Sequence, residues 1–183
     1  MEEQRPFLRT ERCLLTPMKP GDAEGIARFL LDPGVMWTWE RAFSPEDVGT
    51  WIERSMNEHA RWGYSLMTAR LHSGTIIGRA GLRRDVIDGE EVVEAGWILA
   101  RAFWGWGYAT ELALALLAVA PALAEGRRVV AEIRPENMAS ARVALRAGMK
   151  KAASFAKTCG EKVLMHDLYV YDDAASCARP GVS

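Results

Sequence analysis

A chain of 183 residues with 49% hydrophobic side chains can bury one core, so we expect a single domain over residues 1–171 and a mobile polar tail at 172–183. Because 23 Lys and Arg residues oppose 24 Asp and Glu residues, the net charge of −1 excludes a broad basic surface for stable nucleic-acid binding or for an anionic membrane. The polar start, the absence of a ~20-residue apolar run and three widely spaced cysteines argue against a signal peptide, a membrane span and a disulfide framework, and they favour a cytoplasmic protein.

The first half of the chain predicts a strand, two helices and three further strands. Residues 13–18 have the pattern of a short strand, and residues 21–31 carry apolar side chains at helical spacing behind Asp22, a plausible helix cap. Ser44 and Pro45 open a second helix that runs to about His59. Short turns then join three strands into an antiparallel run. These strands are residues 63–71, 75–82 and 91–99.

The second half predicts alternating helices and strands. An apolar stripe with a period of 3.6 indicates a helix that begins near Gly107 and is ended or bent by Pro121. A buried strand, a helix stopped by Gly148 and two final strands follow. Their ranges are 128–133, 137–147, 149–155 and 162–171. This order predicts an α+β fold with a central mixed sheet and helices on its faces.

The sharpest motif is a glycine-containing loop between the strand at 91–99 and the next helix. It comprises Trp104, Gly105, Trp106, Gly107, Tyr108, Ala109 and Thr110. Unpaired N–H groups at a helix start attract phosphate oxygens, so this loop could hold a diphosphate. Neither Gly-Lys-Ser/Thr nor a third glycine follows, which excludes a P-loop and a dinucleotide fingerprint. Taken alone, two glycines at such a turn are better explained by backbone geometry.

Glu94 is the candidate catalytic base. Strand alternation places its side chain on the same face as Val92, Gly96 and Ile98, and partial burial among them would raise its pKa. A carboxylate tuned in this way can remove a proton from an ammonium group. On residue type alone, an ion pair with Arg83 or Arg84 is the more ordinary explanation.

Asn137 and Ser140 form the third candidate feature. Asn137 is a natural N-cap for the helix at 137–147, and Ser140 sits at the third helical position, so a cap worth about 1 kcal/mol explains both residues structurally. The functional alternative is that both face a gap between diverging parallel strands and hydrogen-bond a ligand there.

In this order, these residues resemble the GCN5-related N-acetyltransferase (GNAT) superfamily, and within it the branch of ribosomal-protein N-terminal acetyltransferases. The similarity covers nearly the whole chain, and the joint order of the fragments is more specific than any one of them. The fragments are residues 8–15, 21–23, 76–82, 94–97, 104–111 and 136–149.

The resemblance implies a mostly antiparallel mixed sheet with a V-shaped opening between the strands at 91–99 and 128–133, which holds acetyl-CoA. The pantetheine arm would pair with backbone near Ile98 and Leu99, the pyrophosphate would rest on the loop from Trp104 to Thr110, and Asn137 would bond the pantetheine. A backbone N–H at the end of the first strand would stabilise the oxyanion.

The family mechanism implies direct transfer. Glu94 would help to deprotonate the amine, the amine would attack the thioester, and an acid would protonate the CoA thiolate. The position of the usual tyrosine acid is Ala144 here, and Ser140 is the replacement that the ribosomal-protein branch suggests. Ala102 stands where relatives often carry Gln or Arg before the loop, so phosphate contacts are expected to be mainly from backbone. Glu161 is a second candidate base from the same comparison.

The acceptor is expected to be a primary amine on a protein N-terminus, an aminoglycoside or a small molecule. Four tryptophans could line an apolar slot for it, although most of the seven in the chain are expected to be buried in packing. The four are Trp37, Trp39, Trp51 and Trp62. Glu40, Glu46 and Asp47 could attract a cationic amine, or simply be solvated acids at a helix start. The sequence leaves a homodimer open.

Two other classes of function are alternatives for this sequence. A non-catalytic acyl-CoA-binding or sensing module would keep the cleft without the chemistry, and the missing tyrosine is its best support. A nucleotide-binding protein would respond to ATP or NAD instead of CoA. Metal catalysis is not predicted, because His59, His72 and His166 cluster neither with one another nor with cysteines.

Overall fold

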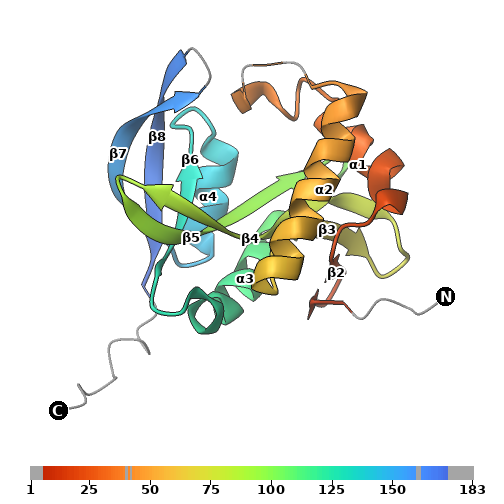
Figure 1. Ribbon diagram of the computed structural model, residues 1–183, viewed down its shortest axis with the longest axis horizontal. Helices are drawn as coiled ribbons and strands as arrows, with labels where there is room; N and C mark the ends of the chain where they lie inside the picture. Colours follow the sequence, from red (N-terminus) through yellow and green to blue (C-terminus); the bar gives the residue numbers. More distant parts are fainter. Residues whose placement is uncertain (1–5, 40, 42, 160–161, 173–183) are drawn as a thin grey trace.

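The computed structural model describes residues 6–39, 41, 43–159 and 162–172, and it contains one curved sheet with helices on both faces (Figure 1). The strands are β1 (Leu8–Arg9), β2 (Cys13–Thr16), β3 (Leu66–Leu71), β4 (Ile76–Ile87), β5 (Glu90–Leu99), β6 (Arg128–Ile133), β7 (Lys150–Cys159) and β8 (Lys162–Tyr171). The helices are α1 (Ala23–Leu30), α2 (Pro45–Trp62), α3 (Tyr108–Ala124) and α4 (Met138–Arg146), with 3-10 turns at Pro20–Asp22, Trp37–Trp39 and Arg101–Phe103. Among the described residues, no helix has both the length and the apolar character that a membrane crossing requires.

The predicted order of elements is confirmed, with four corrections. The short strand β1 was not predicted. Strand β4 continues five residues beyond the predicted end at Leu82, and β7 continues to Cys159, beyond its predicted end at Phe155. Helix α3 continues through Pro121 to Ala124, so this proline does not end the helix. The predicted tail after Asp172 lies outside the described residues.

Asp22 stands at the N-cap position of α1, but its side chain does not cap the helix. Instead, this buried carboxylate accepts hydrogen bonds from Thr68 Oγ1 at 2.7 Å and from Arg70 on β3. The predicted cap is therefore wrong, because an arginine and a hydroxyl on the sheet compete successfully for the carboxylate. Asp22 connects α1 to the sheet.

The sheet has the strand order β1-β2-β3-β4-β5-β6-β8-β7. The first five strands are antiparallel neighbours, and β6, β8 and β7 form a second antiparallel group. The two groups meet in a single parallel pair, β5 and β6. This arrangement confirms the predicted mixed, mostly antiparallel sheet.

The parallel pair is short. Its register runs from Val92 opposite Arg128 to Glu94 opposite Val130, and no pairing continues beyond these residues. The last five residues of β5 and the last three of β6 therefore lack each other as partners. This divergence forms the V-shaped opening predicted between the two strands.

The two faces of the sheet differ in chemistry. Helices α3 and α4 cover one face with an apolar core that includes Leu82, Val93 and Leu116. Helices α1 and α2 cover part of the other face around Ile26 and Ile52, as Figure 1 shows. The charged side chains of the candidate site lie on this second face, because alternation along β4 and β5 places Arg83 and Glu94 there as neighbours.

The expectation that most tryptophans are buried is wrong. Trp37, Trp39, Trp104 and Trp106 are 44% to 68% exposed. The other three, at positions 51, 62 and 97, are half-buried. Two of these half-buried indoles instead stack with arginine side chains: Trp51 with Arg79 and Trp62 with Arg84.

Candidate active site

The opening between β5 and β6 exposes one backbone edge of β5. The Ala100 N–H donates to the Ile77 carbonyl at 2.8 Å, towards β4. In an antiparallel pair, alternate residues direct their backbone groups to the partner strand, so those of Ile98 also point to β4, while those of Trp97 and Leu99 point into the opening. The Leu99 carbonyl there accepts a hydrogen bond from Trp104 Nε1 at 2.7 Å. Of the two residues predicted to pair with a ligand, the geometry favours Leu99.

The predicted loop lies directly beyond this edge. Gly105 and Gly107 have φ angles of 80° and 83°, a left-handed conformation that glycine adopts without cost. Gly107 is the N-cap of α3, and the described residues offer no hydrogen-bond acceptor to the N–H groups of Tyr108, Ala109 and Thr110. These free donors and the positive end of the helix dipole suit a phosphate.

Arg12 and Glu111 brace this loop. Glu111 accepts from Thr10 Oγ1 at 2.5 Å, from the Arg12 N–H at 2.8 Å and from Arg12 Nε at 2.6 Å. Arg12 Nη1 also donates to the Trp106 carbonyl at 2.9 Å. Although partial burial acts to raise the pKa of Glu111, these hydrogen bonds outweigh it and lower the pKa. The sequence did not predict this brace, because its partners are about 100 positions apart.

Asn137 and Ser140 lie at the start of α4, as predicted. Asn137 Oδ1 accepts from the Ser140 N–H at 3.1 Å, which confirms the cap. Both side chains are half-buried, so they remain available to a ligand. Ala144, which occupies the usual position of the tyrosine acid, is fully buried in the core, so no side chain from that position reaches the opening.

Glu94 lies at the point where the two strands part. It accepts from Arg83 Nε at 2.6 Å, and its side chain is 14% exposed. Burial raises the pKa of Glu94, the Arg83 charge opposes this shift, and nearby Glu132 adds to it. The ion pair with Arg83 and the raised pKa, which sequence analysis treated as alternatives, therefore occur together.

Glu132, on the β6 side of the opening, was not predicted as a site residue from the sequence. Carboxylate oxygens of Asp85, Glu94 and Glu132 lie within 4.8 Å of one another. Lys157 donates to Glu132 Oε2 at 2.6 Å, while the buried Oε1 has no hydrogen-bond partner in the described part of the chain. The signal was present as a charged residue inside the otherwise apolar strand at 128–133, but its proximity to Glu94 depends on strand order.

The electrostatics of this carboxylate cluster favour a single positive charge. The three carboxylates of Asp85, Glu94 and Glu132 could be ligands of a divalent metal ion. Arg83 and Lys157 already make contacts of 2.5 to 3.9 Å with them. Three carboxyl groups are thus in direct contact with two cationic side chains, an arrangement that attracts a further cation.

An aromatic cluster lies beside these charges. The rings of Trp39, Phe43 and Trp51 are 5.3 to 5.8 Å apart, and the guanidinium of Arg79 stacks 3.8 Å from the Trp51 ring centroid. Trp51 thus lies on the second face of the sheet, where it also packs against the core between α1 and α2. That it lines a slot for the acceptor stays a prediction. Asp47 instead pairs with Arg41 at 2.9 Å, and this contact holds the pKa of Asp47 down to about 2. Glu40 and Glu161 lie outside the described residues.

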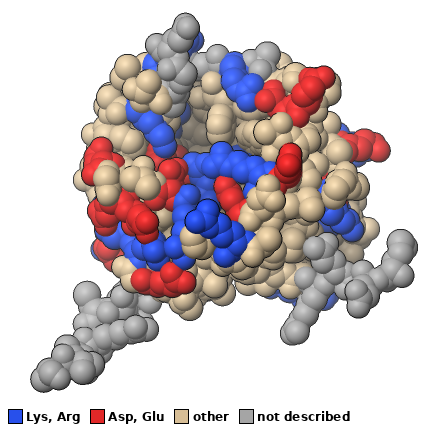
Figure 2. Space-filling model, in the orientation of Figure 1, with Lys and Arg blue, Asp and Glu red and all other residues tan. Residues whose placement is uncertain are grey.

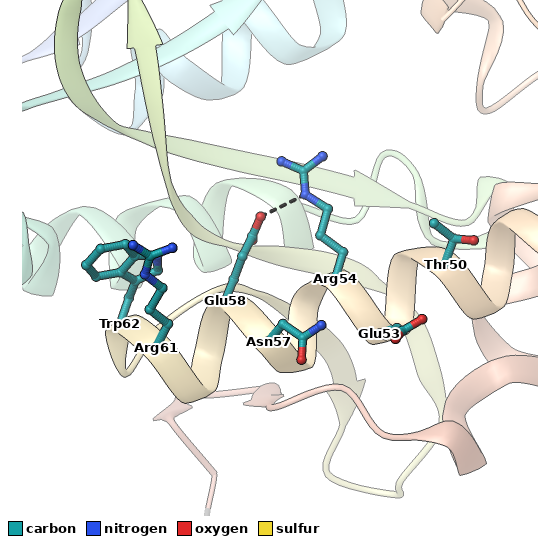
Figure 3. A pocket seen from close by; sticks show the side chains of 7 residues that line it. All are labelled: Thr50, Glu53, Arg54, Asn57, Glu58, Arg61 and Trp62. Atoms are coloured by element: carbon teal, nitrogen blue, oxygen red, sulfur yellow. Dashed lines mark hydrogen bonds and ion pairs between the residues drawn. The ribbon is translucent and has the colours of Figure 1, made fainter.

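The surface over this face is hollowed and strongly charged. Figure 2 shows Lys and Arg side chains gathered beside a hollow in the middle of the molecule. A groove of about 490 Å³ runs along α2, and Figure 3 shows Arg54 and Glu58 rising from this helix towards the strands. The lining residues are Thr50, Glu53, Arg54, Asn57, Glu58, Arg61 and Trp62. Arg54 and Glu58, which line this groove, are close enough to Arg79 to influence its pKa.

The fold and the opening define an acyltransferase that takes its acyl group from acetyl-CoA. The family described as "Acetyltransferase (GNAT) domain" matches residues 12–150, and the chain belongs to this family. It is 30% identical over 152 residues to the uncharacterized protein YkkB of Bacillus subtilis, and this alignment covers 82% of this chain and 88% of YkkB. It is 25% identical over 165 residues to the uncharacterized N-acetyltransferase YnaD of the same organism, covering 90% and 94%.

Solved structures share the same fold. The acetyltransferase from Agrobacterium tumefaciens str. C58 superposes with a TM-score of 0.76 at 25% identity, covering 94% of this chain and 98% of that one. Two further structures are 17% identical to this chain. The microcin C7 self-immunity acetyltransferase MccE, solved with acetyl-CoA and AMP, has a TM-score of 0.70 and covers 87% of this chain and 92% of its own. The ribosomal L7/L12 acetyltransferase RimL, solved with CoA, has a TM-score of 0.72 and covers 91% of this chain and 97% of its own. Acetyl-CoA is the co-substrate of the acetyltransferase family to which the chain belongs.

Proposed function

We propose that this enzyme transfers an acetyl group from acetyl-CoA to a primary amine by direct attack, with Glu94 as the base. One observation carries the proposal. The parallel pairing stops at Glu94, so the buried carboxylate stands where the exposed edge of β5 begins.

Acetyl-CoA fits the groups along this opening. Its phosphates would rest on the N–H groups of the loop from Gly105 to Thr110, and its pantetheine amides would pair with Leu99 and bond Asn137. The thioester would then lie along the unpaired part of β5. A backbone N–H of that strand, at Trp97 or Leu99, is positioned to stabilise the oxyanion.

The carboxylate cluster supplies the acceptor site. The acceptor ammonium would approach Glu94 and the unpartnered Oε1 of Glu132, whose buried negative charge favours a cation. Glu94 takes one proton from the ammonium, directly or through water, and the free amine attacks the thioester carbonyl to give a tetrahedral intermediate. The C–S bond then breaks, and the second amine proton passes to the CoA thiolate. The Ser140 hydroxyl on α4, acting with water, is the candidate that relays this proton and is itself reprotonated in the transfer.

Release of CoA thiol from acetyl-CoA, measured with a panel of primary amines, tests the proposal. Glu94→Gln should lower kcat/KM by about 10²- to 10⁴-fold, as expected for loss of a general base, and should leave acetyl-CoA binding intact. Glu91→Gln is the matched control, because Glu91 lies on the same strand but is exposed and pairs with Arg127. Equal activity of Glu94→Gln and wild type would refute the assignment of the base.

A further inference from the structure

Arg79 on β4 carries a positive charge that the described residues leave unpaired. No ion pair or hydrogen bond to its guanidinium exists in the described ranges, although the group is half-buried. A guanidinium has five N–H donors, and removing them from water without acceptors costs free energy. Burial, together with the like charges of Arg83 and Arg54, lowers the pKa of Arg79 to about 9, so the group still carries its charge at neutral pH.

The surroundings of Arg79 hold it in place without neutralising it. Trp51 stacks on one side of the guanidinium at 3.8 Å, which leaves the N–H edge free to donate. The neighbouring arginines show that pairing is the rule on this face. Arg83 bonds Glu94 and Asp85, and Arg54 donates to Glu58 at 2.8 Å. Arg79 differs from both, because its guanidinium has no partner among the described residues and its N–H groups can bind a ligand.

Arg79 and the carboxylate cluster face the same space. In the β4–β5 register, Arg79 lies opposite Ile98 and Arg83 lies opposite Glu94. The residue of β5 between Ile98 and Glu94 on this face is Gly96, which has no side chain to separate them. The charges of Arg79 and Glu94 influence each other. One molecule that carries both an acid group and an amine could therefore contact both groups.

From this arrangement we propose that the acceptor is a small amino-acid-like molecule. Its carboxylate or other acid group would be bound by Arg79, which stacks on Trp51, while its amine would face Glu94 and Glu132. The amine half of this inference rests on the proposed function, whereas the anion site rests on Arg79 alone. Polyamines and aminoglycosides, which carry only positive charge, would leave Arg79 unpaired and place further cations beside Arg54 and Arg83.

Matched acceptors test the proposal through kcat/KM for CoA release. Phenylalanine, its amide and phenethylamine share one apolar body and differ at the carboxylate, and rates are expressed per unprotonated amine because their basicities differ. For the wild-type enzyme, kcat/KM with phenylalanine should exceed kcat/KM with the other two amines by about 10- to 100-fold, the range expected for a charged hydrogen bond. Arg79→Gln should abolish this preference without changing the KM for acetyl-CoA. Arg54→Gln, which removes an arginine that is already paired, should keep it.

A binding measurement separates the anion site from catalysis. Calorimetric titration of 3-phenylpropionate and of phenylphosphonate into the protein–CoA complex should show binding to wild type and at least 10-fold weaker binding to Arg79→Gln, and it distinguishes a carboxylate from a phosphate preference. Arg79-dependent binding without acetylation of any amine would refute the proposed function and keep the anion site. Three results would overturn the inference. The first is an acetylation rate that does not depend on the carboxylate of the acceptor, and the second is an effect of Arg79→Gln that is seen only with acidic peptides. The third is binding of both anions that Arg79→Gln leaves unchanged.

Discussion

The raised pKa of Glu94 has opposite effects on activity and on stability. As the proposed base, Glu94 must be ionised to accept a proton, so kcat/KM should rise with pH through the raised pKa of Glu94, and this acidic limb should be absent from the residual activity of Glu94→Gln. Burial, the main cause of the shift, stabilises the protonated form in the folded state. The stability that Glu94 contributes is therefore fully present below the unfolded pKa of about 4.3 and is lost as the pH rises through the folded pKa.

It follows that the Tm of Glu94→Gln relative to wild type should increase between pH 4 and pH 8, because the variant lacks the buried charge. Differential scanning calorimetry at a series of pH values measures this trend, with Glu91→Gln as the exposed control on the same strand. Removal of Glu94 leaves Arg83 paired with Asp85 at 2.8 Å, so the variant has no stranded cation to offset the gain. A relative Tm that falls as the pH rises would contradict the assigned direction of the pKa shift.

At the scale of single elements, the loop before α3 combines backbone geometry with binding. Gly107→Ala should cost about 1–2 kcal/mol of stability, because φ is 83°, and it should also weaken acetyl-CoA binding at least 10-fold by disturbing the N–H groups. The new methyl group would stand 3.5 Å from Arg12 Nη2, an ordinary contact, so a protein clash does not explain the loss. Gly74→Ala, at φ 88° in the β3–β4 turn, is the control for strain. Calorimetry that finds equal CoA affinity in the two variants would exclude the phosphate role of this loop.

Asp22 makes the attachment of α1 to the sheet testable. Asp22→Ala should lower the free energy of unfolding by about 3–5 kcal/mol, because it strands Arg70 and Thr68, which are themselves largely or fully buried. Glu24→Ala on the same helix breaks an exposed ion pair with Arg28 and should change stability by less than about 0.5 kcal/mol. Urea unfolding compares the two variants, and similar losses for both would mean that the buried pair is not the main attachment.

The same elements explain what the sequence could and could not predict. Periodicity located the helices and most strands, since those segments bury one apolar face. The predicted end of β4 at Leu82 was wrong because Arg83 and Asp85 interrupt the apolar alternation, although both belong to the strand and line the candidate site. Glu132 and Arg79 were overlooked for a similar reason. Their importance arises from neighbours on other strands, and strand order was not available from local spacing.

On the scale of the whole molecule, the opening divides the sheet into two groups of strands. Strands β1–β5 and strands β6–β8 share only the short parallel pair that ends at Glu94 and Val130, and α3 packs against both β5 and β6 on the far face. In the function proposed above, the co-substrate and the acceptor would meet where these two groups diverge. The loop and Leu99 border the opening on the side of the first group and Glu132 on the side of the second. Arg79 would complete the acceptor side.

Binding of acetyl-CoA in the opening should therefore protect specific backbone amides from hydrogen exchange. Trp97 and Leu99 direct their N–H groups into the opening, so their exchange should slow when pantetheine pairs with β5, whereas Ile98, already bonded towards β4, should change little. The N–H groups of Tyr108, Ala109 and Thr110 should slow in the same titration because the phosphates cover them. Residue-resolved exchange measured by NMR, with and without acetyl-CoA, distinguishes this alternating pattern from general stabilisation, which would protect Ile98 equally and would argue against strand-like pairing of the co-substrate.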